Sequence, residues 1–252
     1  MNLLLVALAG ACVGTTFGVF GAGGSAFATP VLVLLGVPAP VALASPLPAM
    51  LPASLAGAHQ YLRSGHLCPR TARLAVLAGV PAVIVGALLS AAVGGAALLA
   101  LSGVLLLVVG ARMVLPARAP ATPAPGTPAV DDDRTTLVVV LVAAAAFLTG
   151  LLANGGGFLL VPIFVLVLGF TATRAAGTSM IAVAALLVPT LLTHWYLGNI
   201  DWGVAGAFAL GVVPATVLGA RLGGRIPEAV ARRAFGLVLI VFASWFLAVR
   251  VV

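Results

Sequence analysis

The chain has 252 residues, of which 63% are hydrophobic and only 7% are charged, and its formal net charge is +7. A soluble domain carries about 25% charged residues. Twelve Arg and five acidic residues are therefore too few to cover the surface of a soluble fold of this size. This composition excludes a soluble globular domain and predicts an integral membrane protein. The Arg residues stand in short clusters between apolar segments, which is typical of membrane loops and argues against nucleic-acid binding.

Breaks marked by Gly, Pro and charge divide the chain into ten apolar segments. A crossing needs about 20 apolar residues, so the length accommodates eight to ten membrane segments. Two segments are too short to cross alone and are expected to form half-helices after Gly-rich turns. The predicted fold class is an all-α polytopic membrane protein. The segments cover residues 2–21, 25–36, 40–62, 71–91, 95–115, 136–153, 157–169, 174–197, 203–222 and 229–250, the short ones being 25–36 and 157–169.

Gly and Pro positions repeat at a nearly constant offset, which indicates an internal duplication. Gly23-Gly24 returns 132 positions later as Gly155-Gly156, and Gly36 returns 133 later as Gly169. A stretch rich in Pro and Asp separates the copies and is predicted to be an extended, solvated linker on the cytoplasmic side. We therefore expect a first transmembrane repeat over residues 1–115, a linker over 116–134 and a second repeat over 135–252.

The Arg residues predict the orientation of the segments. If segments one and two, and segments six and seven, form hairpins that return to their starting side, every Arg except Arg250 faces the cytoplasm. The first repeat then starts outside and the second starts inside. Two five-segment repeats of opposite orientation form an inverted repeat, which is common in secondary transporters. The alternative is eight plain spans, with each short segment fused into its neighbour.

Two Gly-rich turns precede the short segments and are the first candidates for a binding site. Buried irregular backbone in a membrane must be satisfied by protein or by a cavity, and Gly lets a ligand approach the main chain. Free N–H groups opening a half-helix favour an anion, and two inverted copies would present two such groups near the midplane. The alternative is that these glycines only allow close helix packing. The residues concerned are Gly23, Gly24 and Ser25 in the first copy and Asn154, Gly155, Gly156 and Gly157 in the second.

Hydroxyl side chains follow each turn and form a second candidate set. Ser45, before Pro46, corresponds to Thr178-Ser179 in the second half. These hydroxyls would either hydrogen-bond an oxyanion or bond a carbonyl of their own helix, which is the usual arrangement in membrane helices.

His59 and His194 form a third set, 135 positions apart and each near the end of an apolar segment. An imidazole at a pathway mouth can carry a proton or attract an anion. The preferred interpretation is an interfacial position beside the belt aromatics Tyr61, Trp195 and Tyr196.

The sequence lacks the residues that several kinds of functional site would need. No Asp, Glu or Lys falls inside a predicted membrane segment, so a carboxylate-coupled cation mechanism has no group to use. Cys12 and Cys68 have neither CxxC spacing nor a His or Asp cluster, which disfavours a metal site or a disulfide. We expect no cofactor, no metal and no catalytic residues.

The chain resembles the sulfite exporter TauE/SafE family of bacterial membrane proteins over nearly its full length. The resemblance rests on residues 18–24 followed by Pro30, on their second copy over 154–162, on 176–179 and on 198–202. The first copy departs from the family pattern, with Ser25 in place of a third Gly and Ser45-Pro46 in place of a small residue followed by Ser. The resemblance implies export of sulfite or small organosulfur anions.

The sequence therefore predicts a multi-pass transporter of small anions, sulfite or a related organosulfur anion, in the bacterial inner membrane. Its expected partners are the anion and the lipid bilayer, with oligomerisation left open, and its mechanism is alternating access around a midplane site. The alternatives are an intramembrane enzyme that uses His59 or His194 as a base, and a membrane assembly partner that transports nothing.

Overall fold

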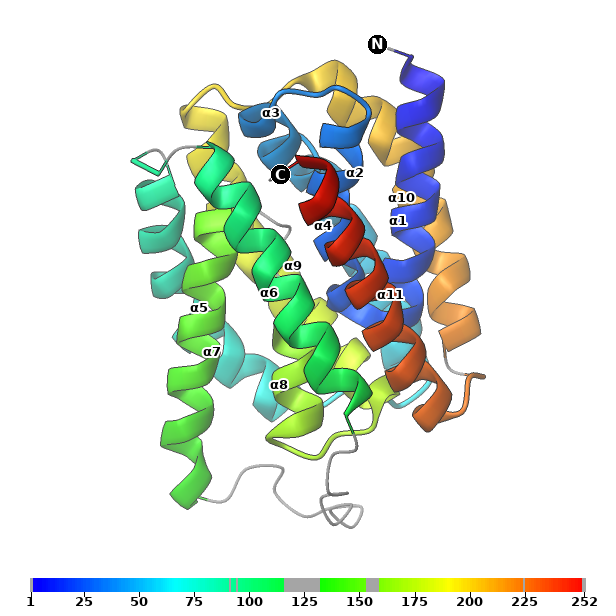
Figure 1. Ribbon diagram of the computed structural model, residues 1–252. Helices are drawn as coiled ribbons and strands as arrows, with labels where there is room; N and C mark the ends of the chain where they lie inside the picture. The colour runs from blue at the N-terminus through cyan, green and yellow to red at the C-terminus, as the bar shows by residue number, and fades with distance from the viewer. Residues whose placement is uncertain are drawn as a thin grey trace.

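The computed structural model describes residues 2–90, 92–93, 95–115, 132–152, 159–223 and 225–250, and within these ranges the chain forms helices and their connections without strands (Figure 1). This confirms an all-α polytopic membrane protein. The helices are α1 (Leu3–Phe20), the 3-10 helix η1 (Gly21–Phe27), α2 (Ala28–Leu34), α3 (Ala39–Ala44), α4 (Leu47–Arg63), α5 (Pro69–Ser90), α6 (Gly95–Val114), α7 (Asp132–Leu152), α8 (Leu160–Leu166), α9 (Ala172–Tyr196), α10 (Trp202–Gly223) and α11 (Glu228–Arg250).

The observed helices follow the predicted segments with three differences. The third segment divides at Ser45-Pro46 into α3 and α4, because Pro46 has no N–H to continue the helical hydrogen bonds, although Ser45 keeps helical backbone angles. The first short segment is preceded by η1, so α2 begins at Ala28. The predicted linker extends too far, because α7 already begins at Asp132.

Among the described residues, 6 helices are long and apolar enough to cross a membrane. They correspond to α1, α3 with α4, α5, α9, α10 and most of α11. The described parts of α6 and α7 contain shorter apolar stretches, Ala100–Val114 and Thr136–Leu152. The short helices α2 and α8 lie among these longer ones.

The helix directions in Figure 1 agree with the predicted hairpins. Helix α1 runs from the upper end to the lower end, and α2 returns upward; α7 starts at the lower end, and α8 returns downward. The helix ends that carry Arg residues all lie at the lower end, apart from Arg250 at the end of α11 and Arg118, which is outside the described residues. By the positive-inside rule the lower end is cytoplasmic.

Glycines bring two helix pairs into very close contact. A Cβ added at Gly18 in α1 would collide with the Thr216 carbonyl oxygen in α10, and one added at Gly150 in α7 would collide with the Val83 carbonyl oxygen in α5. Gly150 follows Gly18 by 132 positions, and Thr216 follows Val83 by 133. Such small-residue stripes are how membrane helices approach closely without a hydrophobic driving force between them. The same contact is therefore made twice, at equivalent positions.

Equivalent turns also recur at the ends of the short helices. Gly36 follows α2 with φ 86°, and Gly169 follows α8 with φ 66°, a left-handed conformation that favours Gly at the end of a helix.

The closest helix pairs join opposite halves of the sequence. Helix α10 packs on α1 and α4, whereas α5 packs on α7 and α9, and α4 contacts α9 where these two groups meet. Helices α6 and α11 pack on each other. We call α1, α4 and α10 the first bundle, and α5, α7 and α9 the second bundle. Each bundle combines helices from both halves, so neither half is a separate structural unit.

Candidate transport site

The first Gly-rich turn is helical. Gly23, Gly24 and Ser25 belong to η1, which continues directly into α2, and the Ala28 N–H donates a hydrogen bond to the Ser25 carbonyl. The main chain here is thus more regular than the predicted open turn. Ser25 is fully buried, and η1 contacts α8 and α9 of the second half. These contacts place the first turn between the two halves.

The second Gly-rich turn, with Asn154, Gly155, Gly156 and Gly157, lies outside the described residues. The helix that follows it, α8, starts at Leu160 and packs on α7, on α9 and on η1. Short elements from the two halves therefore contact each other inside a shell of longer helices, with η1 of the first half against α8 of the second.

The candidate hydroxyls divide into two groups. Ser179 donates to the Ala176 carbonyl of its own helix at 2.9 Å. In contrast, Ser45 accepts from the Asp201 N–H at 3.0 Å, and Thr178 accepts from the Cys68 N–H at 3.0 Å. These last two bonds join residues 156 and 110 positions apart. We call them the outer tether (Ser45–Asp201) and the cytoplasmic tether (Thr178–Cys68).

A buried hydroxyl that the sequence interpretation overlooked is Thr29 in α2. Its side chain is fully buried, and its Oγ1 has no hydrogen-bond partner among the described residues. The equivalent position in α8, 132 residues later, is Val161. The sequence did contain a signal for Thr29. It follows the candidate Ser25 by four positions in a predicted half-helix, and residues four apart lie on the same face of a helix. A buried polar group without a partner costs stability and calls for an explanation.

The two candidate histidines occupy different environments and are not equivalent. His59 lies on an exposed face of α4, whereas His194 in α9 is 3% exposed. Main-chain hydrogen bonds show which residues of the two halves are equivalent here. The His66 N–H donates to the Tyr61 carbonyl, and the Asn199 N–H donates to the His194 carbonyl, both at 3.1 Å, so equivalent residues are 133 positions apart. The offset of 135 was therefore wrong here, and His194 occupies the place of Tyr61.

Tyr61 and His194 each face the end of the helix that precedes a Gly-rich turn. The Tyr61 hydroxyl donates to the Gly18 carbonyl at 2.9 Å, at the end of α1. The His194 imidazole lies near the Gly150 carbonyl, toward the end of α7; its Nδ1 is 3.5 Å from the Asn199 side-chain nitrogen, and its Nε2 has no hydrogen-bond partner among the described residues. The histidine is thus buried at a helix contact, in the last turn of α9.

The helix starts beside the two tethers differ in chemistry. Asp201 caps α10, its Oδ1 accepting from the N–H groups of Gly203 and Val204 at 2.8 and 3.0 Å. Cys68 takes the same place before α5, with its Sγ 3.3 Å from Thr71 Oγ1. Burial raises the pKa of the Cys68 thiol, but hydrogen bonds from Thr71 and the Arg174 side chain outweigh burial, so that this pKa lies below its ordinary value. Both positions favour a negative charge at a helix N-terminus.

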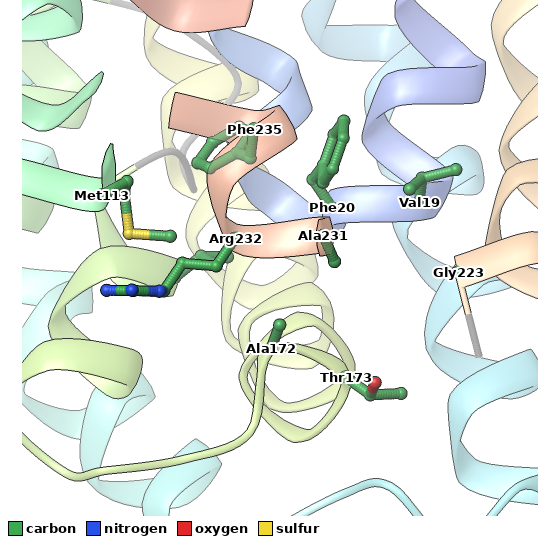
Figure 2. A pocket seen from close by; sticks show the side chains of 10 residues that line it. Val19, Phe20, Met113, Ala172, Thr173, Gly223, Ala231, Arg232 and Phe235 are labelled. Atoms are coloured by element: carbon green, nitrogen blue, oxygen red, sulfur yellow. The ribbon is translucent and has the colours of Figure 1, made fainter. Parts of the chain in front are cut away.

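A pocket at the cytoplasmic end lies where α1 meets η1 (Figure 2). Val19 and Phe20 of α1, Val161 of α8 and Arg232 of α11 are among its lining residues. The Arg232 guanidinium donates to the Leu115 carbonyl after α6 at 3.3 Å. The cavity measures only about 10 Å³, which is room for a single water.

The comparisons with known proteins agree with this architecture. The family model for the sulfite exporter TauE/SafE matches residues 6–246. The chain belongs to the sulfite exporter TauE/SafE family. Two relatives named "Probable membrane transporter protein", from Xylella fastidiosa strains 9a5c and Temecula1, are 30% and 29% identical over 97% of this chain and 94% of their own length. No solved structure matches. This member of the family is a multi-pass membrane transporter.

Proposed function

We propose that this family member exports small anions, specifically sulfite or a related organosulfur anion, across the bacterial inner membrane. The observation that carries the proposal is the contact between η1 and α8 inside the shell of long helices, in a chain of this family. No acidic residue lies within the six candidate spans, so the interior offers main-chain amides and hydroxyls to an anion but no carboxylate to repel it.

The proposed binding site combines the two Gly-rich turns with nearby hydroxyls. Gly23, Gly24 and Ser25 contribute from the first half, and Asn154 and residues 155–157 contribute from the second. The Thr29 hydroxyl, which is buried and has no hydrogen-bond partner among the described residues, is an additional donor to an oxyanion. Ser45 and Thr178, together with Ser179, were assigned to this site from the sequence; the tethers give the first two a holding role as well.

Alternating access is the proposed mechanism, with the bundles as the moving units. The glycine contacts lock α1 to α10 and α5 to α7, so a rocking motion cannot separate the sequence halves. The proposed motion is instead between the first and second bundles, which meet at α4 and α9. In this mechanism, opening at the cytoplasmic end would move α11 with Arg232 away from α1, which lines the same pocket.

Flux through the purified chain in proteoliposomes tests the proposal. Liposomes loaded with sulfite, thiosulfate or phosphate are compared, and sulfite is expected to leave fastest. Thr29→Val keeps the shape of the side chain and should reduce sulfite flux by about tenfold, because it removes a hydrogen bond to a charged ligand. Gly24→Leu and Gly156→Leu should abolish the flux.

Gly206→Leu provides the matched control, because an added Cβ at Gly206 meets open space. Its flux should equal that of the unaltered chain. Unchanged transport of every sulfur anion by Gly24→Leu and Gly156→Leu would refute the proposed binding site. Transport of phosphate in preference to sulfite would refute the proposed substrate.

A further inference from the structure

A groove opens on the second bundle near its cytoplasmic end. It measures about 340 Å³, a size within the range of ligand pockets. Leu67 in the α4–α5 connection, Val76 and Leu77 in α5, and Ile181 in α9 are among the apolar residues that line it. Leu77 is 72% exposed, so the groove faces outward from the helix assembly and not toward the proposed transport site.

One charged residue, Arg73, stands among these apolar walls. Its side chain is exposed, and none of the acidic residues of the chain belongs to the α4–α5 connection, to α5 or to α9. An Arg guanidinium binds phosphate through paired hydrogen bonds. The groove therefore lacks an anion from its own helices and presents a fixed cation beside an apolar surface.

The duplicated position shows that helix packing does not require this Arg. The residue 133 positions after Arg73 is Gly206 in α10, where an added Cβ would meet open space. The equivalent surface at the outer end of the molecule thus has no cation at this position. Of the two equivalent positions, only the one at the cytoplasmic end is charged, and this is the side on which the phosphates of the inner leaflet lie.

We propose that this groove is a binding site for one anionic phospholipid of the inner leaflet. The lipid phosphate would pair with the Arg73 guanidinium, and an acyl chain would lie along Val76, Leu77 and Ile181. An apolar trough with a single cation among its lining residues complements one acyl chain and one phosphate. Basic pockets between membrane helices on the cytoplasmic side recognise anionic headgroups in this way. The site is separate from the transport site and would stabilise the contact between α5 and α9.

Native mass spectrometry of the full chain, purified in detergent, tests the proposal with added phosphatidylglycerol and phosphatidylethanolamine. The unaltered chain should retain one phosphatidylglycerol in preference to phosphatidylethanolamine. Arg73→Gln should lose this preference, with an affinity for phosphatidylglycerol lower by about tenfold. Val76→Trp should reduce the retention of both lipids, because the indole would fill the groove.

Arg70→Gln is the matched control, because Arg70 is an exposed residue of the same helix turn that does not line the groove. This variant should bind phosphatidylglycerol as the unaltered chain does. If Arg70→Gln and Arg73→Gln lost the same amount of bound phosphatidylglycerol, the binding would depend on net charge and not on Arg73, and the proposal would be overturned. Equal retention of both lipids by the unaltered chain, as expected of annular lipid only, would also overturn it.

Discussion

Two connections have the same main-chain conformation. One joins α4 to α5 at the cytoplasmic end, and the other joins α9 to α10 at the outer end. Gly65 and Gly198 have φ angles of 72° and 70°, and each connection is held by a tether of 3.0 Å from the other half. Their side chains differ, because Cys68 takes the capping place of Asp201. The two connections thus have the same main-chain geometry but different side-chain chemistry at the two ends of the molecule.

The largest expected effect tests whether the two glycine contacts are equivalent. Gly18→Leu and Gly150→Leu should each prevent stable folding, because the new side chain would collide with main-chain oxygens that cannot move aside. We expect a cost above about 3 kcal/mol in each case. The measurement is the yield of monodisperse protein and its thermal unfolding in detergent, with Gly206→Leu as the tolerated control. A stable Gly150→Leu beside an unstable Gly18→Leu would break the comparison.

Removal of the tethers should have a smaller effect, larger at the cytoplasmic end than at the outer end. Ser45→Ala and Thr178→Val each leave one N–H without its acceptor, which costs about 1–3 kcal/mol for the buried Cys68 N–H and less for the part-buried Asp201 N–H, which water can reach. The costs should add in the double variant, since the tethers lie at opposite ends of the molecule. Thermal unfolding of the single and double variants measures this. Non-additive losses would mean that the two connections are coupled.

The smallest expected effect is a pH dependence of stability that comes from Cys68 before α5 and distinguishes it from Asp201 before α10. Because the pKa of Cys68 is lower in the folded chain than in the unfolded chain, ionisation stabilises the fold. This contribution is fully present above the unfolded pKa of about 8.5 and is lost as the pH falls through the folded value. The stability difference between the unaltered chain and Cys68→Ser should therefore grow with pH across that window. Cys12→Ser, at an exposed position of α1, is the control and should show no such trend.

The sequence predicted the helical segments well, because composition and Gly and Pro breaks determine where a membrane helix begins and ends. The matching pairs Gly36–Gly169 and Gly18–Gly150 mark equivalent main-chain geometry in the two halves. Gly is favoured at both kinds of position, because it tolerates a left-handed turn and allows a very close helix contact. These constraints depend on the main chain and are therefore visible as repeated letters in the sequence.

Side-chain roles were harder to predict, because a residue's type does not specify its partner. Ser45 and Thr178 look like membrane hydroxyls of any kind, yet they accept from N–H groups more than a hundred positions away. The pairing of His59 with His194 followed residue identity, whereas the backbone pairs His194 with Tyr61. Equivalent positions that have diverged in chemistry cannot be aligned by identity alone. The placement of the substrate-binding residues remains a proposal.

The glycine stripe of α1 also has a consequence for biosynthesis. Gly10, Gly14 and Gly18 pack against residues 208–220 of α10, so the partner surface of α1 is synthesised roughly 200 residues after α1 itself. At about 5–20 residues per second, roughly 10–40 s separate the synthesis of the two surfaces. During this interval the small-residue face of α1 must be shielded by lipid or by the insertion machinery. A chain truncated before α10 would leave the glycine face of α1 without its partner helix. That unpaired face is the feature by which cellular quality control would recognise the truncated product.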